Sequence, residues 1–326
     1  MNLRNYFVIV LVLLMVALLG STALASEQIK IGVTQIVDHP ALDAARQGFI
    51  DRMTELGYPE GEVALYDIHS AQGDMSIATT IAQKFVADKV DLILAIATPT
   101  SQAAANVTST IPILITAVTD PVAAGIVDSI EKPGGNVTGT SDLTPVVSQL
   151  RLLLDIAPGV QRVGIVYNAG EVNSVVQVDI AKEAAAELGI TIVEATAGSS
   201  AEVLQAAQSL RGRVDAIYVP TCNTAVTALE SIVHVAEQER IPLIAGDDHS
   251  VERGALATQG INYYNLGRQT ADIAVRVLKG EDPANISIEY LEEADLLVLN
   301  LSAAERMNVQ FSEELLAKAT KVIEEP

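Results

Sequence analysis

The chain has 326 residues, of which 49% are hydrophobic and only 4% aromatic, and it contains no tryptophan. Its formal net charge of −21 would repel the phosphates of nucleic acids and anionic lipid head groups, so the composition argues against nucleic-acid binding and against a membrane-surface protein. The single cysteine, Cys222, excludes an internal disulfide, and stability must come from a hydrophobic core.

Residues 1–25 have the pattern of a secretory signal peptide. Arg4 precedes an apolar run over 7–19, which is followed by small residues ending in Ala-Leu-Ala. The run is shorter than the roughly 20 residues that span a bilayer, and no basic stop-transfer cluster follows it. We predict export to the periplasm or another extracytoplasmic space and cleavage before Ser26, with an uncleaved anchor as the alternative. No cysteine stands at this point to carry a lipid, so we expect a soluble monomer.

From residue 28 onward, short β-branched runs alternate with amphipathic segments. In the segment 41–56 the apolar residues recur every three or four positions, which places them on one face of a helix that ends at Gly57. Strands are predicted at 29–33, 63–68, 92–96, 113–116 and 137–139, and helices at 76–87 and 101–107. This alternation is typical of a doubly wound parallel sheet with right-handed crossovers.

The same alternation begins again after residue 145. Helices are predicted at 146–156, 174–188, 201–210, 224–238 and 266–278, and strands at 163–167, 191–195, 216–219, 243–245, 255–259, 286–291 and 296–301. Val90–Leu94 is echoed by Val214–Tyr218, which favours a duplication over the chance reuse of common strand residues.

About 300 mature residues exceed what one hydrophobic core usually serves. We therefore predict two α/β lobes joined by a hinge with several crossings. The N-terminal lobe comprises residues 26–142 plus 261–285, and the C-terminal lobe comprises 143–260 plus 286–326. The first crossing is expected at 137–143.

Several motifs, spread in order over the chain after the signal peptide, closely resemble a family of ABC-transporter substrate-binding proteins. They are Gln72–Asp74, Ile96–Pro99, Ala117–Pro121, Pro133–Gly139, Tyr167–Ser174, Gly254–Thr258 and Tyr263–Gln269. The resemblance implies a type I periplasmic binding-protein fold with the ligand between the lobes, and an ABC permease with its ATPase as partners. Family members with assigned ligands resemble receptors for aromatic amino acids. They often carry an Asp within the stretch 220–224, where this chain has Cys222, and this difference weakens the implied assignment.

Ligands of open parallel sheets bind beyond the carboxyl ends of the strands, and polar side chains follow these ends in both halves. The candidates are Gln35, Gln72, Thr98, Thr100, Ser101, Thr119 and Asp120 in the first lobe, and Tyr167, Asn168, Asn173, Ser174, Thr221, Asn223 and Asp247 in the second.

Helices that begin near Thr98 and Asn173 offer free N–H groups to a ligand carboxylate. Asp247 is the candidate partner of a ligand ammonium. Purely structural roles are the alternatives: helix caps for Thr98 and Asn173, turns for Asp120 and Asp247, and packing for Tyr167.

Enzymatic signatures are missing from the sequence. It contains no nucleophile elbow, phosphate loop or dinucleotide fingerprint, and its four histidines lack metal-ligand spacing, so we expect no catalysis, cofactor or metal. Two further functions are compatible with this type of fold. A repressor's ligand-binding domain is disfavoured by the export signal and by the lack of a DNA-binding N-terminus. A surface receptor or sensor, for signalling or adhesion and with a small organic ligand other than an amino acid, is the main alternative.

Overall fold

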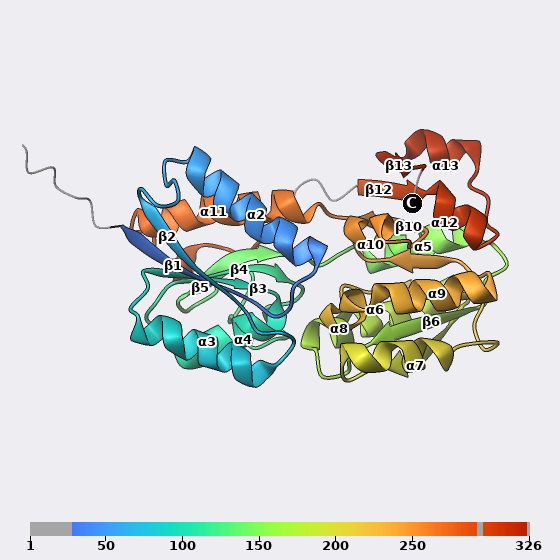
Figure 1. Ribbon diagram of the computed structural model, residues 1–326, viewed down its shortest axis with the longest axis horizontal. Helices are drawn as coiled ribbons and strands as arrows, with labels where there is room; N and C mark the ends of the chain where they lie inside the picture. The colour runs from blue at the N-terminus through green and yellow to red at the C-terminus, as the bar shows by residue number, and fades with distance from the viewer. Residues whose placement is uncertain (1–27, 292–295, 325–326) are drawn as a thin grey trace, which may run out of the picture.

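The computed structural model describes residues 28–291 and 296–324, which form two α/β lobes lying side by side (Figure 1). The predicted fold class is confirmed. The predicted signal peptide, 1–25, lies outside the described residues. Among the helices of the described residues, none is long and apolar enough to cross a bilayer.

The first lobe is built on a parallel sheet with strand order β11-β5-β4-β3-β1-β2. Its strands are β1 (Ile29–Gln35), β2 (Ala64–Ser70), β3 (Leu92–Ile96), β4 (Ile113–Val118), β5 (Val137–Ser141) and β11 (Glu289–Tyr290). Helices α2 (Pro40–Glu55) and α11 (Tyr263–Leu278) cover one face, while α3 (Met75–Ala87) and α4 (Thr98–Val107) cover the other (Figure 1). Because both faces are covered, the central strands β3 and β4 are buried along their whole length and are apolar except for Thr116.

Helices α2 and α11 pack unusually closely, and glycine makes this possible. A Cβ atom added at Gly267 of α11 would lie 1.9 Å from the carbonyl oxygen of Ala45, and one added at Gly48 of α2 would lie 2.0 Å from that of Tyr264. Each helix therefore presents a glycine to the backbone of the other. This contact fixes the segment that follows residue 262 against the first lobe.

The second lobe has a sheet of order β13-β12-β10-β9-β8-β6-β7, in which β12 runs antiparallel to β10. Its strands are β6 (Arg162–Tyr167), β7 (Thr191–Thr196), β8 (Ala216–Val219), β9 (Leu243–Ala245), β10 (Ala257–Gly260), β12 (Leu296–Asn300) and β13 (Lys321–Ile323). Its helices are α5 (Val146–Ile156), α6 (Val172–Leu188), α7 (Val203–Gln208), α8 (Asn223–Thr227), α9 (Leu229–Glu239), α10 (Asp248–Glu252), α12 (Leu301–Arg306) and α13 (Glu313–Lys318).

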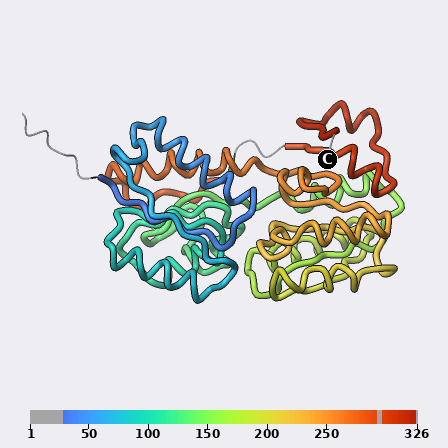
Figure 2. Tube along the Cα trace, in the orientation of Figure 1, coloured from blue at the N-terminus to red at the C-terminus, as the bar shows by residue number. Residues whose placement is uncertain are grey.

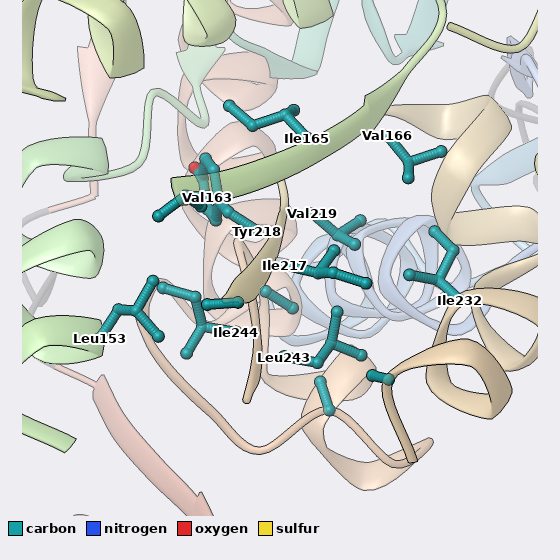
Figure 3. Close-up of a cluster of buried hydrophobic side chains, with 14 of the residues drawn as sticks. Leu153, Val163, Ile165, Val166, Ile217, Tyr218, Val219, Ile232, Leu243 and Ile244 are labelled. Atoms are coloured by element: carbon teal, nitrogen blue, oxygen red, sulfur yellow. The ribbon is translucent and has the colours of Figure 1, made fainter. Parts of the chain in front are cut away.

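The core of the second lobe consists mainly of aliphatic side chains from β6, β8 and β9 with helix residues packed against them (Figure 3). Tyr218 is the large exception. Its buried hydroxyl donates to the side-chain oxygen of Gln149 at 2.7 Å, and the Gln149 amide donates to the carbonyl of Gln259 at 2.8 Å. The buried polar groups of Tyr218 and Gln149 thus all have hydrogen-bond partners, which limits the free-energy cost of burying them.

Three passages join the lobes, because β5, β10 and β11 are each followed by an element of the other lobe. Figure 2 traces the first two, and the third includes residues 292–295, which lie outside the described residues. The structure places two boundaries differently from our prediction. Residues 137–141 form strand β5 of the first sheet, so the first crossing lies after Ser141. Residues after 285 continue the first lobe, because Ile286 and Ile288 are buried in its core and β11 pairs with β5.

Candidate ligand-binding site

Residues that directly follow parallel strands of both sheets line the cleft between the lobes, as Ile36 does after β1 and Asn168 after β6. Across this cleft α2 contacts α10, and α4 contacts α6. Two cavities lie between the lobes, and Asn223 of α8 lines both of them. We call them the inner pocket and the outer chamber.

The inner pocket is small, with a volume of about 10 Å³, room for roughly one water-sized group. Its lining from the first lobe includes His39, Ala117 and Tyr263. The lining from the crossing and the second lobe includes Asp142, Asn173, Thr221, Asn223 and Asp247. Among the described residues that line it, none is lysine or arginine.

Two buried carboxylates give the inner pocket its charge. Asp142 is 3% exposed and accepts hydrogen bonds from the Tyr263 hydroxyl at 2.6 Å and from the Thr119 hydroxyl at 3.0 Å. Asp247 is 2% exposed and accepts from the backbone N–H and the hydroxyl of Ser250, at 2.9 and 2.5 Å. Burial raises the pKa of the Asp142 carboxyl, and the negative charge of Asp247 adds to this effect.

Asp142 also belongs to the hinge. It lies in the first passage between the lobes, whereas its partner Tyr263 begins the helix that follows the second passage. Their hydrogen bond joins two of the three passages. A group that binds Asp142 therefore acts directly on the segment that must bend when the lobes move.

His39 approaches Asp247 from the first lobe. Its Nδ1 atom accepts from the backbone N–H of Leu42 at 3.5 Å, so the ring caps the start of α2. Burial lowers the pKa of the ring below its ordinary value, and the attraction of Asp247 only partly offsets this. The neutral form of His39 is thus favoured in the described arrangement of the lobes.

The outer chamber has a volume of about 410 Å³. Its first-lobe wall includes Ile36, Val37, Met75 and Pro99, together with the amides of Gln72 and Gln102. Its second-lobe wall includes Asn168, Glu171, Ser199, Ser200 and Thr227. One wall is therefore largely apolar and the other is polar.

Three cleft segments of the first lobe hold a residue other than glycine in the left-handed backbone region. Gln72 and Ala97 follow β2 and β3, whereas Ala117 lies near the end of β4, where the pairing with β5 is irregular; their φ values are 52°, 80° and 56°. Such conformations cost free energy and cluster at binding sites. Gln72 and Ala117 themselves line the two cavities.

The structure brings six of the predicted site residues to the cavities. They are Gln72, Asn168, Asn173, Thr221, Asn223 and Asp247. Thr98 lies buried at the start of α4, one residue before a chamber residue, and its hydroxyl has no hydrogen-bond partner among the described residues. Thr119 does not line a cavity itself but donates to Asp142.

The remaining predicted residues are occupied elsewhere. The Gln35 amide donates to Asp38 and Asp43, and the Thr100 and Ser101 hydroxyls donate to backbone carbonyls of β3 and the following loop. Asp120 accepts from two backbone N–H groups of its own turn, which is the structural role given above as its alternative. The Tyr167 hydroxyl donates to Glu194, and Ser174 is buried without lining either cavity.

Cys222 does not face the cavities. Its sulfur accepts from the backbone N–H groups of Asn168 and Ala225, at 3.3 and 3.4 Å, and caps the start of α8 inside the second lobe. Burial raises the pKa of this thiol to about 12. Position 222 is thus a helix cap outside the inner pocket. A thiol at this position therefore leaves the charge of the inner pocket unchanged.

The sequence-based reasoning missed Asp142, His39 and Glu171. Asp142 was assigned to the crossing, although its position directly after the strand end at Ser141 was a usable signal. His39 and Glu171 directly precede helices, where such residues usually serve as caps.

Comparisons with known proteins agree with this arrangement. Residues 30–323 match the family model described as ABC transporter substrate binding protein. A tyrosine-binding protein of Clostridioides difficile is 44% identical over 84% of this chain and 79% of its own length.

Two solved structures differ in how well their lobes superpose on this chain. An ABC domain from Streptococcus pneumonia in complex with L-Trp has a TM-score of 0.88 at 34% identity, covering 91% of this chain and all of the other. The ligand-free, open structure of a substrate-binding protein with adhesive properties from Clostridium difficile has a TM-score of only 0.69 at 43% identity and the same coverage. The described arrangement of the lobes is closer to the liganded relative. Given the match over residues 30–323, the chain belongs to the ABC transporter substrate-binding protein family.

Proposed function

We propose that this protein is the extracytoplasmic receptor of an ABC importer and binds an α-amino acid with an aromatic side chain between its lobes. The observation that carries the proposal is the pair of buried carboxylates, Asp142 and Asp247, in a pocket whose described lining includes no lysine or arginine. A buried carboxylate needs a cation or several hydrogen bonds to offset its desolvation. An ammonium group has about the size of a water molecule and fits the volume of the inner pocket.

The ligand carboxylate would lie between the starts of α4 and α6. Neither helix has a side chain that caps its first turn, and the two helices contact each other from opposite lobes. Two positive dipole ends that approach in this way favour an anion between them. The buried polar atoms Thr98 Oγ1 and Asn173 Oδ1, which have no partner among the described residues, lie at these two helix starts.

The start of α8 is not available for the same purpose, because Glu171 already occupies it. The Glu171 carboxylate accepts hydrogen bonds from the backbone N–H groups of Asn223 and Thr224, both at 3.0 Å. An internal anion thus satisfies this helix, which leaves α4 and α6 for the ligand. The aromatic character of the ligand is taken from the relatives described as tyrosine-binding and as a complex with L-Trp.

Family membership supports export and the expected transporter partners. An ABC permease and its ATPase would receive the ligand, and residues 1–25 would be removed as a signal peptide. N-terminal mass analysis of the exported protein checks cleavage before Ser26. Surface adhesion is a second candidate role, because a relative of 43% identity is described as adhesive. Adhesion that persists when ligand binding is abolished by substitution would establish it as independent of binding.

A thermal-shift screen tests the binding proposal. L-amino acids, their D-enantiomers, nucleobases, sugars and small organic acids are compared at equal concentration. A ligand at about 100 times its Kd adds roughly 2.7 kcal/mol to the free energy of unfolding. L-tyrosine, L-tryptophan or L-phenylalanine should stabilise the protein. Stabilisation by another class of solute alone would contradict the proposal.

A further inference from the structure

The two cavities divide the ligand space unequally. The inner pocket holds about 10 Å³ and the outer chamber about 410 Å³, and Asn223 lines both. A space as small as the inner pocket takes a charged head group and no side chain. The side chain of an amino acid bound there must therefore extend toward the outer chamber, whose volume lies in the range of small-molecule sites.

The chamber continues to the surface of the protein. Met75, at the start of α3, lines it and is 45% exposed. With Ile36, Val37 and Pro99 it forms an apolar wall suited to the face of an aromatic ring. Because this wall ends at an exposed residue, a ring lying on it has its distal end directed toward solvent.

A fixed negative charge borders the chamber on its other side. Among the described lining residues Glu171 alone is charged. Its carboxylate is held by the two N–H groups of the α8 start and also by the side chains of Asn223 at 2.8 Å and Thr224 at 2.6 Å. These four hydrogen bonds fix the charge in place and use the donors that would otherwise attract an anion.

We infer that the outer chamber is the specificity subsite for the ligand side chain, that it admits uncharged aromatic side chains extended at their distal end, and that Glu171 excludes anionic ones. This inference rests on the proposed function, since it assumes an amino acid whose ammonium lies in the inner pocket. It names the class of substrate: aromatic amino acids and their neutral derivatives at the ring position farthest from the α-carbon.

Calorimetry with three ligands tests the inference: L-tyrosine, O-methyl-L-tyrosine and O-phospho-L-tyrosine. The methyl ether should bind within about 10-fold of tyrosine, because its extension reaches the open end of the chamber. The phosphate ester should bind about 100-fold or more weakly, because its charge meets that of Glu171. Equal binding of the phosphate and methyl derivatives would overturn the inference.

The Glu171→Gln variant identifies the source of the discrimination. It should reduce the affinity ratio of methyl to phosphate ester by about 10-fold or more, since the repulsive charge is removed. Because both esters are measured with the same variant, their affinity ratio is unaffected by any general loss of affinity that follows from the altered cap of α8. An unchanged ratio in a folded variant would exclude Glu171 as the determinant.

A pair of variants on α3 tests the apolar wall without changing the cap of α8. Met75→Trp should fill the mouth of the chamber and lower the affinity for O-methyl-L-tyrosine relative to L-tyrosine by about 10-fold. The matched control is Val86→Trp on the same helix, at a residue that is 36% exposed and does not line the chamber. If both substitutions lower this relative affinity equally, or if neither lowers it, the ligand side chain does not lie against Met75. If no aromatic amino acid binds the wild type, the proposed function itself fails and the inference falls with it.

Discussion

Replacing Asp247 with Asn tests the electrostatic origin of ligand binding. Asp247 caps α10 by accepting from the N–H group of Ser250, and asparagine is an equally good helix cap. The substitution therefore keeps the shape of the side chain and the cap while removing one negative charge from the inner pocket. A loss of affinity can then be assigned to the charge and not to local unfolding.

The expected loss follows from burial. Asp247 is 2% exposed, so an ammonium beside it would be almost fully desolvated. Leaving one member of a buried charge pair without its partner costs about 2 to 4 kcal/mol, which corresponds to roughly a 30- to 800-fold increase in Kd. Asp38→Asn is the control, because Asp38 is exposed and its carboxylate accepts from Gln35 and Gln72.

Isothermal titration calorimetry with L-tyrosine measures both variants, and thermal unfolding without ligand verifies that they are folded. We expect Asp247→Asn to weaken binding much more than Asp38→Asn does. An Asp247→Asn variant that is folded and binds as tightly as wild type would show that Asp247 is not the ammonium partner. Asp142 would then be the remaining carboxylate of the inner pocket.

Two further predictions concern pH and stability. Burial lowers the pKa of His39, so the described arrangement of the lobes favours its neutral form; if ligand binding stabilises this arrangement, affinity should fall as pH drops below the ordinary value of 6.5, and His39→Gln should flatten the pH profile. Protonation of Asp142, whose pKa burial raises, acts in the same direction, so a profile that rises toward low pH would contradict both. Gly267→Ala places a Cβ 1.9 Å from a backbone carbonyl of α2 and should cost about 1 to 3 kcal/mol in denaturant unfolding. Gly159→Ala, which meets no atom within 4 Å, is the control and should be nearly neutral; equal stabilities would contradict the proposed close contact.

The fold could be predicted from the sequence because its signal is repeated many times. The central strands are mostly apolar runs, as in β3, and the covering helices bury apolar residues that recur every three or four positions, as in α2. The lobe boundary at 285 was placed a few residues too early because β11 has only two residues, Glu289 and Tyr290. Pairing over such a short length leaves no periodic pattern in the sequence.

The site was predicted less well because a strand-end position does not determine where a side chain points. Tyr167 ends β6 as expected, yet its hydroxyl bonds to Glu194 instead of facing the cleft. Cys222 follows β8 and turns into the lobe to cap α8. Asp142 lines the inner pocket only through the folding of the hinge, which brings Tyr263 to it from 121 positions away in sequence. Such contacts depend on tertiary packing and leave no local signal.

Calorimetry of the wild-type protein with three related ligands tests the central claim most directly. L-tyrosine carries both charged groups, 3-(4-hydroxyphenyl)propionate lacks the ammonium, and tyramine lacks the carboxylate. If Asp142 and Asp247 bind the ammonium and the starts of α4 and α6 bind the carboxylate, each truncated ligand should bind at least about 30-fold more weakly than L-tyrosine. Binding of the propionate as tight as that of L-tyrosine would contradict the account, because the inner pocket would then have no ammonium to hold.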